Sequence, residues 1–173
     1  MRRGEALALR RSDLDLERGY AAISRASVTA GYRVHQSTPK TDRGRRSVAL
    51  DSATVAALRE HRRHQATERL ALGPAYQDHR LAFCPEDGTP LHPDRVSKLF
   101  ARHVDALGAT RITLHGLRHT WASLALQAGI NPKVVSERLG HTTVSFTLDT
   151  YSHVMPGIQE HSAARVASLV FNA

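Results

Sequence analysis

The sequence of 173 residues predicts an α+β fold that is mainly helical, with a small antiparallel three-stranded sheet near the N-terminus. Residues 20–50 are rich in β-branched and small side chains, and Gly19 and Gly31 provide turn positions. The second half instead repeats apolar residues at helical spacing, between glycine and proline breakers. Strands that precede helices along one short chain favour the α+β class.

The first fifty residues are expected to supply the sheet. A short helix over residues 1–12 should lead into a strand at 13–16, where acidic and apolar residues alternate. The Asp-Arg-Gly tripeptide at 42–44 is typical of a hairpin tip and precedes a strand at 47–50. We therefore expect antiparallel strands joined by short turns.

Two helices are predicted after the sheet. Asp51 or Ser52 can cap a long, charged helix that ends before Gly73. Its apolar residues near one face are Val55, Leu58, Ala66 and Leu70. Pro93 suits the first position of a second helix, which Gly108 ends. The apolar residues at helical spacing in this segment are Val96, Leu99, Phe100, Val104 and Leu107.

Further helices are predicted towards the C-terminus. A helix over 115–128 carries one apolar stripe, formed by Leu117, Trp121, Leu124 and Ala128. Arg118 lies about 100° from this stripe, so the pattern does not require it in the core. Asn131 opens the next helix, Gly140 stops it, and a short helix leads to Tyr151.

The charge balance points to a polyanionic partner. With 24 Lys plus Arg against 16 Asp plus Glu, the formal net charge is +8, which favours association with nucleic acid. No apolar run approaches the roughly 20 residues that span a bilayer, and no signal peptide is recognisable. The single cysteine, Cys84, excludes an internal disulfide and a metal site built from several thiolates. We therefore expect a cytoplasmic protein without membrane contact, cofactor or metal ion.

Four separated stretches combine residue types suited to phosphate chemistry. They are Arg2, Lys40, the box at 115–118, and the Leu-Gly-His element at 139–141 with Tyr151 ten residues later. Taken singly, each has an ordinary alternative, because exposed cations are usually solvated and a histidine at a helix C-terminus can serve the helix dipole. Their combination and order carry the prediction.

In this order the stretches resemble the tyrosine recombinase family, which includes the phage-type integrases. The family's opening Arg-Arg-Gly-Glu run corresponds to residues 2–5, and its Pro-Lys-Thr hairpin corresponds to 39–41. Its His-x-x-Arg box matches 115–118, and its Leu-Gly-His element matches 139–141. The segment 149–154, Asp-Thr-Tyr-Ser-His-Val, is similar to the region around the family's nucleophile. The last three motifs, at these separations and in this order, are specific.

The resemblance implies a catalytic domain that recombines DNA at specific sites through a 3′-phosphotyrosine intermediate. Tyr151 would be the nucleophile, and the covalent intermediate would conserve the bond energy so that no ATP is needed. Arg2 and Arg118 would hold the phosphate, because a planar guanidinium can contact two of its oxygens. Nearby positive charge would favour the phenolate, and His115 would help to remove its proton.

Lys40 is the candidate general acid for the departing deoxyribose oxygen. An ammonium group can release a proton after a modest pKa shift, whereas a guanidinium cannot. Lysine occurs only three times among the 24 basic residues, which favours this role for Lys40 over that of a surface lysine. His141 would hydrogen-bond the phosphate, and Glu5 would support the site structurally. His119 and His153 adjoin the motifs and are expected to pack or hydrogen-bond in supporting positions.

The resemblance also implies partners. The cations expected to contact double-stranded DNA are Arg43, Arg45, Arg46 and Lys133. Family members act as tetramers on two duplexes at the nucleoid, and residues 156–171 look like the C-terminal helix that neighbouring protomers exchange. Relatives carry a separate core-binding domain before the catalytic one. Residues 1–173 are therefore expected to form a single, N-terminally truncated catalytic domain without the core-binding domain.

Three alternatives remain open at this point. A helix-turn-helix module around Gly129 would explain the basic charge without a catalytic tyrosine. An enzyme similar to type IB topoisomerases would use nearly the same chemistry without strand exchange. A non-catalytic recombinase fragment would keep its packing residues and bind DNA without cleaving it.

Overall fold

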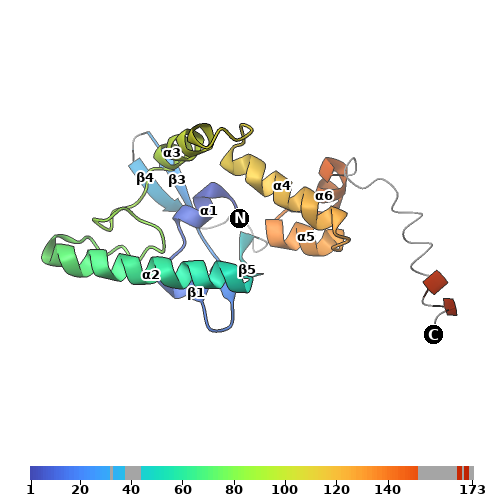
Figure 1. The fold of residues 1–173 in the computed structure, drawn as a ribbon, viewed down its shortest axis with the longest axis horizontal. Coiled ribbons are helices and arrows are strands. Elements are labelled where there is room, and N and C mark those ends of the chain that lie inside the picture. The colour runs from blue at the N-terminus through green and yellow to red at the C-terminus, as the bar shows by residue number, and fades with distance from the viewer. Residues whose placement is uncertain (32, 38–43, 152–166, 169, 172–173) are drawn as a thin grey trace.

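The structure is a computed structural model that describes residues 1–31, 33–37, 44–151, 167–168 and 170–171. The order of elements is the predicted one, with strands among the first fifty residues and helices after them. In Figure 1 the strands, the long helix α2 (Ser52–Leu72) and α3 (Pro93–Ala106) lie on one side of the molecule. The helices α4 (Leu114–Gln127), α5 (Pro132–Leu139) and α6 (Val144–Tyr151) lie on the other side. The short helix α1 (Arg3–Leu7) lies between the two sides.

The three-stranded antiparallel sheet is confirmed. β1 (Leu14–Asp15) pairs with β2 (Tyr20–Ile23), and β2 pairs with β5 (Arg46–Ala49). The intervening strands, β3 (Ala26–Ala30) and β4 (Arg33–Ser37), form a separate two-stranded sheet instead of joining the first. The chain therefore builds two small sheets where the sequence predicts one.

The side chains of β5 alternate between the inward and outward faces of the three-stranded sheet. The core cluster on this side consists of Leu9, Ala21, Ile23, Val48 and Ala82. Side chains alternate between the two faces of a strand, so Arg46, two residues before Val48, lies on the inward face as well. This alternation places an arginine beneath the sheet edge rather than on the outer surface.

Helix α2 begins and ends where the sequence predicts. Asp51 caps it by accepting a hydrogen bond from the backbone N–H of Thr54 at 2.9 Å, and Gly73 follows its last residue. The predicted apolar face is wrong at the C-terminal end, where Leu70 is 83% exposed. The last turns project beyond the strands in Figure 1, and the Leu70 side chain there faces solvent. Gln65 is instead the buried residue of this helix.

Local signals also place the remaining helix ends. Pro93 is the first residue of α3 (Pro93–Ala106), as predicted. Asn131 caps α5 (Pro132–Leu139), and α6 (Val144–Tyr151) is the predicted short helix that ends at the tyrosine. Within the described ranges, none of the helices is long and apolar enough to cross a membrane.

Helix α4 (Leu114–Gln127) turns a different face to the core from the one its apolar stripe predicts. Its buried residues are Arg118, Ala122, Ala125 and Leu126. Leu117 and Leu124 of the predicted stripe are 44% and 59% exposed, so that prediction is wrong for them. Alanines form much of the inward face because α4 packs on both α5 and α6, where small side chains allow helices to approach. Trp121 packs at the edge of this core.

Candidate active site

Three arginine side chains from distant parts of the chain meet at the C-terminal end of α5. Their acceptors are the consecutive carbonyls of residues 138–140, which a helix end leaves without intrahelical partners. Arg46 Nε donates to the first carbonyl at 2.9 Å, Arg118 Nη2 to the second at 2.6 Å, and Arg2 Nη2 to the third at 3.1 Å. The negative end of the helix dipole adds to this attraction.

Gly140 makes room for this convergence. Its φ of 68° is left-handed, a conformation that favours glycine and ends α5. A Cβ atom at this position would lie 2.7 Å from Arg46 Nη1. A side chain here would therefore strain the backbone and push the guanidinium out of place.

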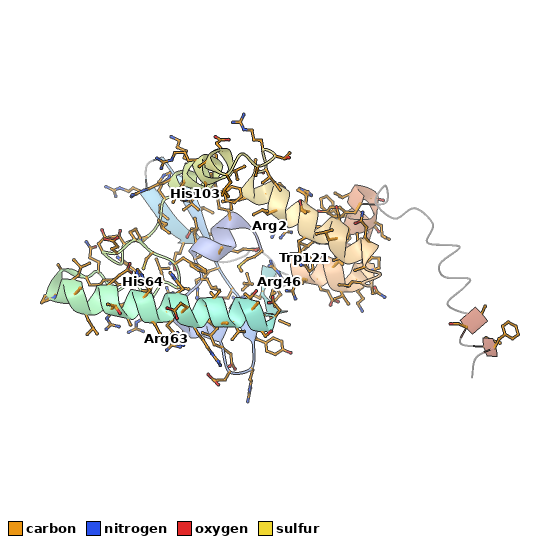
Figure 2. The ribbon with its side chains drawn as sticks, viewed as in Figure 1. Arg2, Arg46, Arg63, His64, His103 and Trp121 are labelled. Atoms are coloured by element: carbon orange, nitrogen blue, oxygen red, sulfur yellow. The ribbon has the colours of Figure 1, made fainter. Side chains whose placement is uncertain are left out.

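Glu5 compensates part of this positive charge. Its carboxylate accepts hydrogen bonds from Arg46 Nη2 at 2.8 Å and from Arg2 Nη1 at 3.1 Å. Burial raises the pKa of Glu5, but the hydrogen bonds from Arg46 and from the backbone of Arg2 outweigh it and hold the pKa below its ordinary value. Figure 2 shows Arg2 and Arg46 near the middle of the molecule, between the sheet side and the helices. Glu5 thus contacts two arginines of the cluster and holds them in place.

Arg46 differs from the surface DNA contact that the sequence predicts. Its side chain is 8% exposed and is held by Glu5 and by the end of α5. Its charge is therefore compensated within the protein. The neighbouring Arg45, which the sequence also predicts as a DNA contact, is exposed.

Arg118 is a buried cation that has no salt bridge among the described residues. It is 7% exposed, and its Nη1 has no hydrogen-bond partner among the described residues. Burial and the charge of Arg2 lower the pKa of Arg118 to about 10, so it still carries its charge at neutral pH. A buried guanidinium nitrogen without an acceptor is suited to receive an anionic ligand.

His141 follows this arginine cluster in the turn before α6. Its Nδ1 lies 2.8 Å from Thr147 Oγ1, which fixes the orientation of the ring. Burial, followed by the charges of Arg118 and Arg2, lowers the pKa of His141 to about 4. The imidazole is therefore neutral near pH 7 and can donate or accept a single hydrogen bond at its other nitrogen.

Tyr151 is the last residue of α6 and is 2% exposed. Its hydroxyl lies 2.7 Å from Nδ1 of His119. Burial raises the pKa of Tyr151, and the positive charge of Arg118 offsets only part of this rise. The sequence predicts that nearby positive charge favours the phenolate of Tyr151, but burial outweighs this effect. A base is therefore needed to remove the proton of the hydroxyl.

His119 links Tyr151 to His115. Its Nε2 lies 2.8 Å from His115 Nε2, and the two rings meet edge to face at 82°. The sequence predicts a supporting position for His119 and the role next to the tyrosine for His115, whereas His119 is the one in contact. The spacing of four residues between them, which puts two side chains on one helix face, is the signal that could have paired them.

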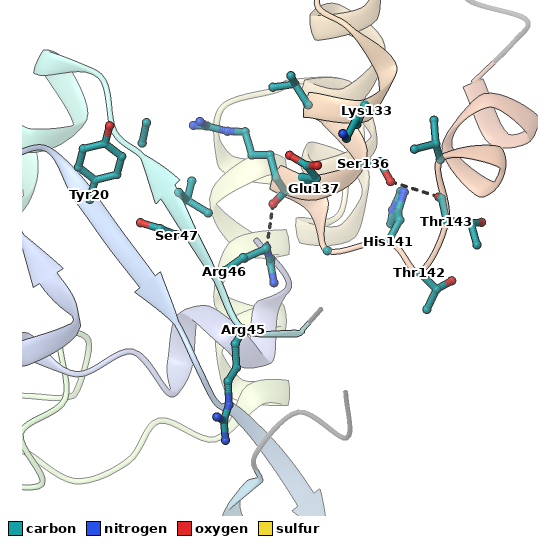
Figure 3. Close-up of a pocket in the computed structure, with 16 residues that line it drawn as sticks. Tyr20, Arg45, Arg46, Ser47, Lys133, Ser136, Glu137, His141, Thr142 and Thr143 are labelled. Carbon is teal, nitrogen blue, oxygen red and sulfur yellow. Dashed lines mark hydrogen bonds between the residues drawn. The ribbon is translucent and has the colours of Figure 1, made fainter. Parts of the chain in front are cut away.

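Two hollows flank the arginine cluster. A groove of about 840 Å³ runs between β5 and α5 and is lined by Arg45, Lys133 and His141, as Figure 3 shows. A pocket of about 400 Å³ is lined by Arg2, His115 and Arg118 among others. Cations thus line both of these solvent-accessible spaces.

The structure brings together most of the predicted catalytic residues. Arg2, Arg118 and His141 surround the end of α5, and the charge of Arg118 acts on Tyr151. Lys40 lies outside the described residues, as do Asp42 and Arg43 of the predicted hairpin tip. The helix predicted over 156–171 also falls largely outside them.

Comparison with known proteins decides the family. The model of the phage integrase family matches residues 1–157. The chain belongs to the phage integrase family. Among curated relatives of this family, a tyrosine recombinase XerC-like protein of Caldanaerobacter subterraneus subsp. tengcongensis is 30% identical over 168 residues, which cover 90% of this chain and 43% of that protein. The integrase of Staphylococcus phage L54a is 30% identical over 180 residues, which cover 99% of this chain and 49% of that protein.

Solved structures of integrases and recombinases share the fold. The Tn1549 transposon integrase in complex with transposon right end DNA has a TM-score of 0.77 at 22% identity, covering all of this chain (100%) and 55% of that one. The XerH site-specific recombinase bound to difH substrate in a post-cleavage complex has a TM-score of 0.64 at 28% identity, covering 95% of this chain and 41% of that one. This phage integrase family chain spans about half the length of the relatives it matches.

Proposed function

We propose that this chain catalyses site-specific DNA recombination by cleaving and rejoining strands through a 3′-phosphotyrosine. The observation that carries the proposal is the grouping of a tyrosine hydroxyl, an imidazole base and arginines with incompletely compensated charge. Family membership over residues 1–157 supports the same chemistry. The phenolic oxygen of Tyr151 attacks the phosphorus, and the 5′ oxygen of the next nucleotide leaves.

Arg118 and Arg2 act on the phosphate. Negative charge increases on the non-bridging oxygens as the phosphorus becomes pentavalent, and fixed cations stabilise that charge. Arg118 has an Nη1 without a hydrogen-bond partner among the described residues for this contact, and Arg2, whose side chain is half exposed, lines the same pocket. His141 donates a further hydrogen bond, and Glu5 keeps the arginines in position without touching DNA.

Lys40 completes the proposed reaction as general acid. The 5′ oxygen leaves as an alkoxide unless it receives a proton, and an ammonium group can supply one. Residues 39–41 match the family's Pro-Lys-Thr hairpin, which supports the role. Neither a cofactor nor a metal ion is required for this chemistry.

The proposed substrate is double-stranded DNA in the cytoplasm, at the nucleoid. Arg45 and Lys133 on the rim of the groove would contact the phosphate backbone, together with Arg43. We further propose that four protomers assemble on two duplexes through residues 156–171. Since the chain spans half of its relatives, the remaining part of such a protein would add contacts on the opposite side of the duplex.

Trapping of the covalent intermediate tests the proposal. The protein is incubated with a pool of nicked duplexes of randomised sequence, and DNA adducts are resolved on denaturing gels and sequenced. We expect a covalent adduct that is absent in Tyr151→Phe. An adduct that persists in this variant would exclude Tyr151 as the nucleophile. DNA binding without any adduct would instead favour a non-catalytic DNA-binding fragment.

A further inference from the structure

Three side chains outside the family's arginine cluster form a continuous hydrogen-bonded chain from the buried tyrosine to the surface. Tyr151 Oη lies 2.7 Å from His119 Nδ1, and His119 Nε2 lies 2.8 Å from His115 Nε2. His115 is exposed and lines the pocket that also contains Arg118. These two hydrogen bonds thus connect the Tyr151 hydroxyl, through His119, to the exposed His115.

The two imidazoles constrain where the protons lie. Two facing Nε2 atoms at 2.8 Å share one proton, so only one of the neutral rings carries Nε2–H. A phenol is a stronger acid than a neutral imidazole N–H, and an imidazole nitrogen is a better acceptor than a phenolic oxygen. The favoured arrangement is therefore Tyr151 O–H donating to His119 Nδ1, with His119 Nε2–H donating to His115.

The electrostatic surroundings keep His119 ready to accept a proton. Burial, followed by the charges of His115 and Arg118, lowers the pKa of His119, so its ring is neutral near pH 7. The titratable and charged groups that act on it are His115 and Arg118 on its own helix, Tyr151 on α6 and His141 beyond α5. A second imidazole behind His119 gives the proton a place to go.

We propose that His119 is a catalytic residue, the general base that takes the proton of Tyr151, and that His115 receives that proton in turn. The inference rests on the proposed function. The Tyr151 O–H bond breaks as its proton moves to His119 Nδ1, the O–P bond forms, and the bond from phosphorus to the 5′ oxygen breaks. The leaving oxygen takes its proton from Lys40, and His119 passes its Nε2 proton to His115. Rejoining reverses these steps.

An asparagine at position 119 separates a base from a positioning residue. The side-chain oxygen of Asn can occupy the place of Nδ1 and accept the tyrosine hydrogen bond, but it cannot take up a proton. A role in positioning predicts that His119→Asn keeps the cleavage rate. A role as base predicts a loss of about 100-fold or more, and a rate that keeps rising with pH because only hydroxide or solvent removes the proton.

The experiment measures single-turnover adduct formation between pH 5 and 9. The substrate is the duplex that the wild-type protein cleaves, with a bridging sulfur in place of the 5′ oxygen, since a thiolate leaves without a general acid. His64→Asn is the matched control, because His64 lies on α2 (Figure 2) and its side chain is 72% exposed. His119→Gln is measured as a second variant at the same position. Thermal midpoints show which of the two variants is folded, and the rate of a folded variant is used for the test.

We expect His119→Asn to lose about 100-fold in rate on the sulfur-substituted duplex, with His64→Asn unchanged. Cleavage by His119→Asn within threefold of the wild type would overturn the assignment. A defect that disappears on the sulfur-substituted duplex would also overturn it, because His119 would then act on the leaving group. Failure of the wild-type protein to form any adduct would instead overturn the proposed function itself.

Discussion

Arg46 on the sheet side and Arg118 on the helix side of the site both have side chains that are largely withdrawn from solvent. They donate to neighbouring carbonyls of the same helix end, but their surroundings differ in charge. Arg46 is paired with Glu5, whereas Arg118 has no salt bridge in the described part of the chain and keeps Nη1 without a partner. A buried charge is costly without compensation, so the pairing of Arg46 serves the fold, and Arg118 remains available to an anion.

The largest effect should follow from removing the carboxylate of Glu5, because this carboxylate pairs with Arg46 whereas Arg118 has no such partner among the described residues. Glu5→Gln leaves Arg46 buried without a counter-charge, and we expect the free energy of unfolding to fall by about 3–5 kcal/mol in urea titrations. The matched control is Glu60→Gln on α2, where both partners of the Arg63–Glu60 pair are more than 70% exposed, at 72% and 73%. This control should change stability by less than about 1 kcal/mol. Equal losses in the two variants would refute the contrast.

Arg118→Gln should show the opposite pattern, with function affected more than stability. The loss of one phosphate ligand should reduce the rate of adduct formation by about 100- to 1,000-fold. Without DNA, the unfolding free energy should change by only about 1 kcal/mol, because the lost hydrogen bond to the Leu139 carbonyl is offset by relief of an uncompensated charge. A stability loss as large as that of Glu5→Gln would show that Arg118 is as fully compensated as Arg46.

The burial of His141, together with the charges of Arg118 and Arg2, should also affect the pH dependence of stability. The pKa of His141 is about 4 in the folded protein and 6.5 in its ordinary state. The unfolded chain therefore takes up this proton first, and stability should decrease as the pH falls from 6.5 towards 4. We expect His141→Asn to reduce this decrease in urea titrations at pH 7 and 5. An unchanged slope would show that folding does not lower the pKa of His141.

The smallest effects should come from the exposed cations on the groove. Lys133→Ala and Arg45→Ala should each weaken DNA binding several-fold at moderate salt, leaving the unfolding free energy within about 0.5 kcal/mol. Fluorescence anisotropy over a salt series measures this directly. Each variant should reduce the slope of log K against log salt by about 0.9. A variant that leaves the slope unchanged would have no phosphate contact.

Local signals explain what the sequence could predict. The bounds of α2 and α5 follow from Asp51, Asn131 and Gly140, because a cap or a left-handed glycine acts on residues a few positions away. The motifs are equally local, since each occupies a few consecutive residues. Their order along the chain therefore predicts most of the candidate site.

The remainder depends on partners far along the chain. Arg118 is buried because its acceptor carbonyl lies 21 residues on, and Arg46 because its acceptor lies 92 residues on. Neither separation leaves a periodic trace in the sequence. From the helical spacing of its leucines, the sequence predicts that α4 buries Leu117 and Leu124. In the structure, alanines face the neighbouring helices instead. His119 was underestimated for the same reason, since its contact with Tyr151 spans 32 residues.

The three carbonyls at 138–140 fix the spacing between the arginine side chains that bind them, whatever the lengths of the other segments. Guanidiniums supplied by residues 2, 46 and 118 are spaced by adjacent peptide units of one turn. Insertions in the loops that bring these residues there can be absorbed without changing that spacing. A single residue inserted within 138–140 would instead rotate the following carbonyl by about 100° and break the register among the cations.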